Sequence, residues 1–174
     1  MGFRVSWVAS QGIAADEMLR AADRQRTKKR DEIPDLGWYL LELPPWVLLL
    51  ADGRDSYRDL GRTYAKTLSA GGRETLFFRC SDTFMKTDLR CYRDGQEAWS
   101  IIYKSDEETK EPTINGDPPQ LVQEILERLK TKQAEDNDAD YIYELTAEMG
   151  LNLTGFRHDT DPETDDPRPF QVLK

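Results

Sequence analysis

The segment Thr75–Tyr103, with the sequence TLFFRCSDTFMKTDLRCYRDGQEAWSIIY, decides the fold of this chain. It contains runs rich in β-branched and aromatic residues, which we expect to form strands over 74–80, 84–92 and 97–103. The Asp94-Gly95 pair lies between the last two runs, and glycine adopts the positive φ that a tight hairpin turn requires. The segment therefore predicts antiparallel strands joined by at least one hairpin.

The N-terminal half alternates between strand and helix patterns. Strands are expected over residues 3–9, 38–43 and 46–51, and helices over 14–24 and from Asp55 or Ser56 to about Ser69. Between them, the polar stretch 24–32 predicts a loop. Pro44-Pro45 separates two of the strands, because proline cannot donate a hydrogen bond to a sheet. Gly71-Gly72 ends the second helix, since glycine tolerates the left-handed conformation there.

The C-terminal half begins with the clearest helical pattern in the chain, over residues 118–132. Asp117 and two prolines form its first turn. One apolar stripe follows at helical spacing and consists of Leu121, Val122, Ile125, Leu126 and Leu129. Residues 141–143 are then expected to be extended, followed by a weak helix at about 146–149 that ends at Gly150. Residues 157–169 form an acidic segment without periodicity, and residues 170–173 are predicted to dock on the sheet.

These elements predict an α+β fold. We expect a single domain over residues 1–174, with a largely antiparallel sheet and helices packed mainly on one face. The length allows a substantial core, in which the four tryptophans are expected to pack. No apolar run approaches the roughly 20 residues that cross a bilayer, and residues 1–8 lack the pattern of a signal peptide. We therefore expect a cytoplasmic protein that makes no contact with a membrane.

Cys80 and Cys91 are too few for a disulfide framework and lack the spacing of a metal site. Both lie in apolar, strand-like runs, where a cysteine packs as a small hydrophobic residue. The pattern predicts two buried free thiols, and a redox pair is the alternative.

Charge is distributed unevenly along the chain. The net charge is -9, whereas residues 134–166 contain 11 acidic residues and one basic residue, a net of -10. The acidity therefore belongs to this segment, and the remainder is close to neutral. A basic stretch over residues 20–30 has no aromatic residue for base stacking, so a solvated helix end and loop is preferred over RNA binding. Overall acidity argues against binding a nucleic-acid backbone, and we expect no nucleic-acid partner.

The motifs of phosphate-binding loops, dinucleotide-binding turns and hydrolase nucleophile elbows are absent from the sequence. His158 is the one histidine in the chain, which excludes any zinc site that needs two. It stands next to Asp159, which can orient or charge an imidazole. A local hydrogen bond in a loop is the simplest interpretation of this pair, with contact to a partner or catalysis as the alternatives. We predict no catalytic residues, no metal site and no cofactor.

The acidic run Asp159-x-Asp161-x-Glu163-x-Asp165-Asp166 has three interpretations. It is a solvated loop, a surface that binds a basic protein, or a site for a hard cation. The cation site is the weakest of the three, because the run lacks the glycine and glutamate positions that characterise an EF-hand loop.

Residues 75–85, 93–100 and 153–159 resemble a pattern found in small bacterial proteins. That pattern joins a Cys-bearing strand, a short segment with an acid and a methionine, and a hairpin of the form x-D-G-x-x-x-W. The chain is also loosely similar in type to immunity proteins of bacterial polymorphic toxin systems, which are small acidic α+β domains without enzyme motifs. This resemblance implies a cytoplasmic protein that neutralises a toxin by binding it, and it supplies no catalytic residues.

The sequence thus predicts a non-catalytic protein-binding module, an immunity protein whose acidic surface meets a basic toxin domain. The residues expected to contact the partner are Tyr141, Tyr143, Phe156, Arg157, His158, Asp159, Asp161, Glu163 and Asp165. One alternative is an enzyme or small-molecule binder with a pocket near His158 and Arg157. Another is a structural or regulatory interaction module without a toxin partner. The oligomeric state stays open.

Overall fold

The structure is a computed structural model that describes residues 2–53, 56–105, 110–136 and 138–174. The strands are β1 (Arg4–Gln11), β2 (Arg26–Asp31), β3 (Gly37–Leu43), β4 (Trp46–Asp52), β5 (Thr75–Ser81), β6 (Lys86–Arg93), β7 (Gln96–Lys104), β8 (Thr113–Gly116) and β9 (Phe170–Leu173). The helices are α1 (Ala15–Ala21), α2 (Ser56–Asp59), α3 (Arg62–Leu68), α4 (Leu121–Glu135) and α5 (Leu145–Thr154), with short 3-10 segments η1 (Asp82–Phe84) and η2 (Tyr141–Glu144).

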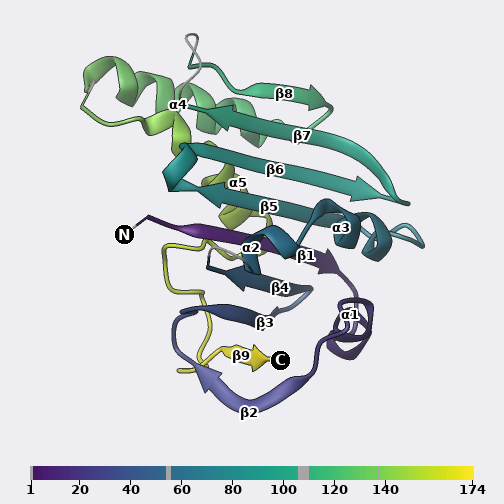
Figure 1. Cartoon of the computed structure of the whole chain (residues 1–174). Helices are drawn as coiled ribbons and strands as arrows, with labels where there is room; N and C mark the ends of the chain where they lie inside the picture. The colour runs from purple at the N-terminus through teal and green to yellow at the C-terminus, as the bar shows by residue number, and fades with distance from the viewer. Residues whose placement is uncertain (1, 54–55, 106–109, 137) are drawn as a thin grey trace.

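Within the described residues, nine strands form one sheet in the order β2-β9-β3-β4-β1-β5-β6-β7-β8 (Figure 1). The pairs from β3 to β8 along this order are antiparallel, which confirms the α+β class and the largely antiparallel sheet. The hairpin at Asp94-Gly95 is present, and both residues have a positive φ, of 47° and 75°. β9 lies between β2 and β3, so the C-terminal residues dock on the sheet as expected.

Helices cover both faces of this sheet. α4 and α5, the two longest, pack with η2 on one face, and α1, α2 and α3 pack on the other (Figure 1). The two longest helices, α4 and α5, therefore lie on one face as expected. The short helices α1, α2 and α3 lie on the other face. The central strands explain the second layer, because β4 and β1 bury consecutive side chains and so present apolar residues to both faces.

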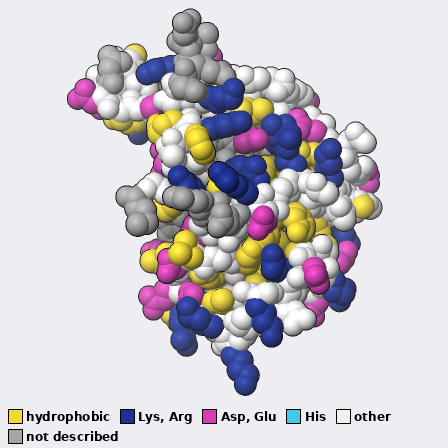
Figure 2. Space-filling view, in the orientation of Figure 1, with side chains coloured by type: hydrophobic (Ala, Val, Ile, Leu, Met, Phe, Trp, Pro, Cys, Tyr) yellow, Lys and Arg dark blue, Asp and Glu magenta, His cyan; other side chains and the backbone are white. Residues whose placement is uncertain are grey.

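The face that carries α2 and α3 also carries many cations. In the view of Figure 2, Lys and Arg side chains gather over β5 and β6 on this face, although the chain as a whole is acidic. The net charge therefore does not describe this part of the surface.

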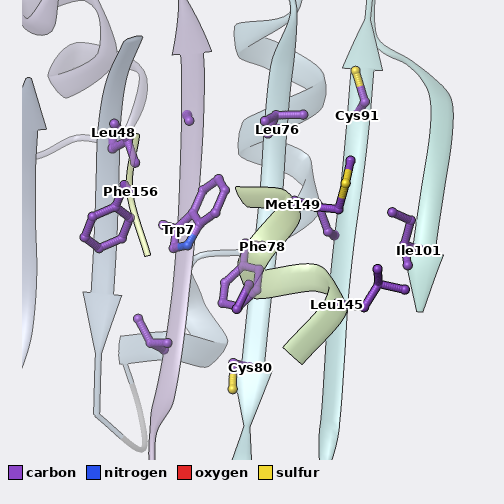
Figure 3. Packing of buried hydrophobic residues seen from close by; sticks show 14 of the residues in the cluster. Trp7, Leu48, Leu76, Phe78, Cys80, Cys91, Ile101, Leu145, Met149 and Phe156 are labelled. Carbon is purple, nitrogen blue, oxygen red and sulfur yellow. The ribbon is translucent and has the colours of Figure 1, made fainter. Parts of the chain in front are cut away.

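The core between the sheet and α5 is built on aromatic stacking. Trp7 and Phe78 stack with ring centroids 5.1 Å apart, and α5 lies over them (Figure 3). Gly150 is inside α5, and a Cβ there would come within 2.9 Å of the Trp7 indole. The prediction that the helix ends at Gly150 is wrong, because this glycine permits close packing and Gly155, with a φ of 78°, ends the helix instead.

Three other local predictions are corrected by tertiary contacts. The polar stretch 24–32 contains the strand β2, because it pairs with β9 and Gln171 Nε2 donates to the carbonyls of Thr27 and Lys29. Residues 141–143 are a 3-10 turn, in which Ile142 is buried in the core cluster that includes α4. The helix expected up to Ser69 is divided between α2 and α3, and its alternative cap Asp55 lies outside the described residues.

Both cysteines are buried free thiols, as predicted. Cys80 pairs with Thr87 across the sheet and Cys91 pairs with Leu76, so the two lie at different levels of neighbouring strands (Figure 3). The described helices include none that is long and apolar enough to span a membrane.

Candidate functional site

β1, β3 and β6 begin at the same end of the sheet. The register pairs Val5 of β1 with Asp52 at the end of β4, and Arg4 with Ser81 at the end of β5. β3 begins beside the end of β4, and β6 begins beside the end of β5. Residues 2–3, 32–36 and 82–85, which precede the three strands, are therefore brought to one end of the molecule.

Large hydrophobic side chains are exposed at this end. Phe3, Ile33, Leu36, Phe84 and Met85, which we call the apolar end, are the exposed large hydrophobic residues of the described part of the chain. Their exposed fractions run from 38% for Met85 to 75% for Leu36. Single exposed hydrophobic residues are ordinary on a protein surface, but a concentration at one place indicates an interaction site.

Specific contacts hold these loops in place. The Phe3 ring meets the His158 ring edge to face at 5.0 Å, and the Phe3 backbone N–H donates to Asp82 Oδ2 at 2.7 Å. Leu36 packs directly over Gly53, where a Cβ would come within 2.8 Å of the leucine side chain. The apolar end is therefore preorganised, which lowers the entropy lost when a partner binds.

The acidic segment 157–169 lies beside the apolar end. A pocket of about 270 Å³ is lined by residues of both, among them Phe3, Ile33, His158 and Asp161. In the view of Figure 2, hydrophobic and acidic side chains lie next to one another at the left of the molecule. Arg30 on β2 anchors the far part of the segment through an ion pair of 2.7 Å with Asp166.

The carboxylates of this segment are of two kinds. Arg157 forms ion pairs with Asp159 and Glu144, and the hydrogen bond that Arg157 donates to Asp159 is the main cause that raises the pKa of Arg157. In contrast, Asp161, Glu163 and Asp165 are exposed, and no described residue forms an ion pair with them. These three charges are the ones available to a partner.

A second pocket, of about 330 Å³, joins Phe3 and Met85 to Cys80, Tyr143 and His158. Cys80 Sγ lies 3.3 Å from Tyr143 Oη, which donates to Asp82 Oδ1 at 2.9 Å. Burial raises the pKa of the Cys80 thiol to about 12, so it is a neutral thiol and a poor nucleophile at physiological pH.

His158 is a packed side chain within this site. Its ring lies between Phe3 and Phe78, and its Nδ1 is buried without a hydrogen-bond partner among the described residues. Burial lowers its pKa, while the nearby Asp159 carboxylate opposes that shift. The imidazole is therefore neutral at pH 7 and holds Phe3 in place. No group of three His, Cys, Asp or Glu side chains in the described ranges is arranged to hold a metal ion.

The structure separates the residues that the sequence assigned to one partner surface. Tyr143, His158, Asp159 and Asp161 line the two pockets at the apolar end. Phe156 lines the first pocket as well, but it is a core residue of which 2% is exposed. Tyr141 is the first residue of η2 and lines neither pocket; it contacts the end of α4, where its ring lies 5.9 Å from Lys132 Nζ and its hydroxyl donates to Asp136 at 2.6 Å. Acidic residues 134–166 therefore form at least two separate groups.

The pocket expected near His158 and Arg157 is present in part. His158 and Asp159 line both pockets described above, whereas Arg157 lines neither and is occupied by its two ion pairs.

Sequence reasoning missed the hydrophobic residues of the apolar end. Phe3 and Phe84 lie in or beside predicted strands, where an aromatic residue is expected in the core. A weak signal was available at Ile33 and Leu36, because each stands next to Pro34-Asp35 in a polar turn where no strand or helix could bury it.

Comparison with known proteins finds no counterpart for this arrangement. No family model matches the chain, and neither a curated protein nor a solved structure is similar to it.

Proposed function

We propose that the protein is a non-catalytic binding module whose apolar end docks on a partner protein with a basic surface. The observation that carries this proposal is the gathering of five exposed hydrophobic side chains at one end of the sheet, beside the exposed carboxylates of segment 157–169. Apolar anchors surrounded by charged residues are the usual composition of a specific protein interface.

The exposed carboxylates beside the apolar end indicate which class of protein would bind there. Asp161, Glu163 and Asp165 are exposed without ion pairs in the described part of the chain, and Glu32 lines the pocket beside them. A partner with a basic face would gain from these charges during encounter, whereas a second acidic end would be repelled. The carboxylates of segment 157–169 therefore favour a basic partner, while Lys28, Lys29 and Arg168 on the other side of Ile33 would meet acidic groups of that partner.

The resemblance of residues 75–85, 93–100 and 153–159 to small bacterial proteins supports a narrower form of the proposal. In that form the partner is a toxin domain, and the protein acts as its immunity protein by covering a basic cleft. Immunity and a cytoplasmic location both belong to the proposal.

The test is a comparison of two variants with the parent. Leu36→Ser with Ile33→Ser removes two exposed apolar side chains, and these changes should leave the melting temperature unchanged because neither side chain is buried. The matched control is Gln11→Ser with Gln96→Ser, two exposed positions at the opposite end of the sheet, where β1 ends and the β6–β7 hairpin lies.

Each protein is immobilised and exposed to native cytosol together with the product of the neighbouring reading frame. The proposal expects a basic protein that the parent and the control retain and the Ile33/Leu36 variant loses. Equal retention by all three proteins contradicts it, and so does a concentration-dependent dimer of the parent that the Ile33/Leu36 variant abolishes.

A further inference from the structure

A second site lies on the face that carries α2 and α3, and it follows from the alternation of side chains along two strands. Phe77, Arg79 and Ser81 of β5 point to this face, because successive side chains of a strand alternate. The register places Arg90, Asp88 and Lys86 of β6 directly opposite them. Tyr57 of α2 and Arg62 of α3 complete a pocket of about 320 Å³ over these strands.

The pocket has more cations than its own carboxylates can neutralise. Its lining includes Arg62, Arg79, Lys86 and Arg90, and Asp88 is the one acidic residue in the lining. Asp88 is already used by Arg90, which binds it through Nε at 2.7 Å and Nη2 at 3.2 Å. No described carboxylate forms an ion pair with the other three cations.

Arg79 is fixed in position without an ion pair to a described carboxylate. Its Nε donates to Ser6 Oγ at 3.2 Å, and its Nη2 donates to the Leu60 carbonyl at 3.1 Å. The guanidinium also lies over the Phe77 ring at 5.2 Å. Burial lowers the pKa of Arg79, and the nearby Tyr57 and Asp88 oppose this shift only in part, so a bound anion would stabilise the charged guanidinium.

Ser81 supplies an independent observation. Its side chain is only 5% exposed and lines the pocket, yet its Oγ has no hydrogen-bond partner among the described residues. Buried hydroxyls without a partner are rare in folded proteins, because losing water without a new hydrogen bond is unfavourable. A hydroxyl beside unpaired cations is a donor suited to an anionic oxygen.

We propose that this pocket, the cationic pocket of Arg62, Arg79, Ser81 and Lys86, binds the phosphate group of a small molecule. Its volume suits a phosphate with one attached ring and is too small for a protein segment. Phe84 lines the same pocket and is 59% exposed, which places an aromatic surface beside the cations. The inference does not depend on the protein partner proposed above, because Arg62, Arg79, Ser81 and Lys86 carry it and Phe84 alone is shared with the apolar end.

The phosphate has two sources that the structure allows, namely a free phosphate or diphosphate, and a phosphate carried by an aromatic molecule such as a mononucleotide. Pyrophosphate, inorganic phosphate, adenosine monophosphate and adenosine are therefore titrated separately into the full chain by calorimetry. If adenosine monophosphate binds more tightly than inorganic phosphate, and Phe84→Ala removes this difference, the ligand is a phosphate carried by an aromatic molecule. Equal binding identifies the phosphate group alone as the ligand.

Two variants make the test specific. Arg62→Gln with Lys86→Gln removes two exposed cations of the pocket and should weaken pyrophosphate binding about tenfold or more. The control, Lys28→Gln with Lys66→Gln, removes the same charge from exposed positions outside the pocket and should leave the dissociation constant nearly unchanged. Ser81→Ala should weaken binding while preserving the melting temperature, because its hydroxyl has no partner to lose.

The proposal is overturned if the parent shows no saturable binding of pyrophosphate. It is also overturned if the pocket variant and the control lose affinity equally, which would show only a nonspecific response to net charge. Binding of adenosine as tight as that of adenosine monophosphate would equally contradict a phosphate site.

Discussion

Asp52 is a carboxylic acid whose pKa is altered by its place at the apolar end. It is the last residue of β4, half-buried next to Gly53 and under the loop that carries Leu36. Burial raises the pKa of its carboxyl to about 6, and the charge of Asp35 raises it further. Two acids close together at this end are consistent with a surface that a basic partner would neutralise.

The raised pKa makes stability depend on pH in a defined direction. The folded state binds a proton on Asp52 more tightly than the unfolded chain, so the stabilising contribution is complete below about pH 4 and is lost as the pH rises through about 6. Asp52→Asn removes this dependence. We expect the variant to be more stable than the parent above pH 7, by up to about 1–2 kcal/mol because solvent screens a half-buried group.

Urea unfolding at pH 4 and pH 7.5 measures this difference. The parent and the variant should have nearly equal free energies of unfolding at pH 4 and should diverge at pH 7.5. A variant that is less stable than the parent at pH 7.5 would show that the carboxylate makes contacts that outweigh its burial.

Among the elements, α4 connects the sequence pattern to the fold most directly. Its stripe at positions 122, 125, 126 and 129 is buried, as the spacing predicts, and packs in the core cluster beneath the sheet. The start of the helix is less well predicted, because Asp117 does not cap it and the helical residues begin at Leu121.

A charge introduced into this stripe should destroy the fold. Ile125→Asp buries a carboxylate without a partner and removes a side chain that is 5% exposed, so we expect a loss of more than about 4 kcal/mol. Gln123→Asp is the control, because it introduces the same charge at an exposed position of the same helix. Thermal unfolding followed by circular dichroism should show no cooperative transition for Ile125→Asp and a nearly parental one for Gln123→Asp. A parental transition for both would exclude the stripe from the core.

The elements that the sequence does not predict are those formed by distant contacts. The strand β2 has the sequence RTKKRD, which has no strand pattern, and its pairing partner β9 is about 140 residues away in the chain. η2 contains Tyr-Ile-Tyr, which favours a strand locally, yet packing of Ile142 turns it into a 3-10 segment. The interior strands β1, β4, β5 and β7 are predictable because their apolar runs are long and bounded by turns.

At the scale of the whole molecule, net charge and local charge differ. The chain has a net charge of -9, yet the cationic pocket lies on one face and exposed carboxylates lie beside the apolar end. Counting charges along the sequence identifies the acidic segment 134–166. The fold divides this segment, because Asp136 lies at the end of α4 and Asp161 lies beside Ile33. Phe156 is a second example: the sequence predicts that it contacts a partner, whereas the fold buries it in the core.

The acidic segment should act on the rate of association. Asp161→Asn, Glu163→Gln and Asp165→Asn together remove three exposed charges, so the melting temperature should stay nearly constant while the association rate with the basic partner falls. Added salt should reduce the association rate of the parent more than that of this variant, because screening acts over about 8 Å at physiological ionic strength.

The matched control neutralises Glu124, Glu127 and Glu135, which are exposed on α4 and line neither pocket of the apolar end. Surface plasmon resonance at several salt concentrations compares the three proteins. An equal fall in rate for both variants would mean that only the net charge matters, and an unchanged rate for the Asp161/Glu163/Asp165 variant would mean that segment 157–169 is a solvated loop.

The central claim is that the apolar end is the contact surface, and hydrogen–deuterium exchange with and without the bound partner tests it most directly. The account predicts slower exchange on binding in residues 32–36 and 82–86, with no change in the hairpin at residues 93–96 at the opposite end of the sheet. Protection confined to that hairpin, or to the end of α4 around Tyr141, would contradict the account.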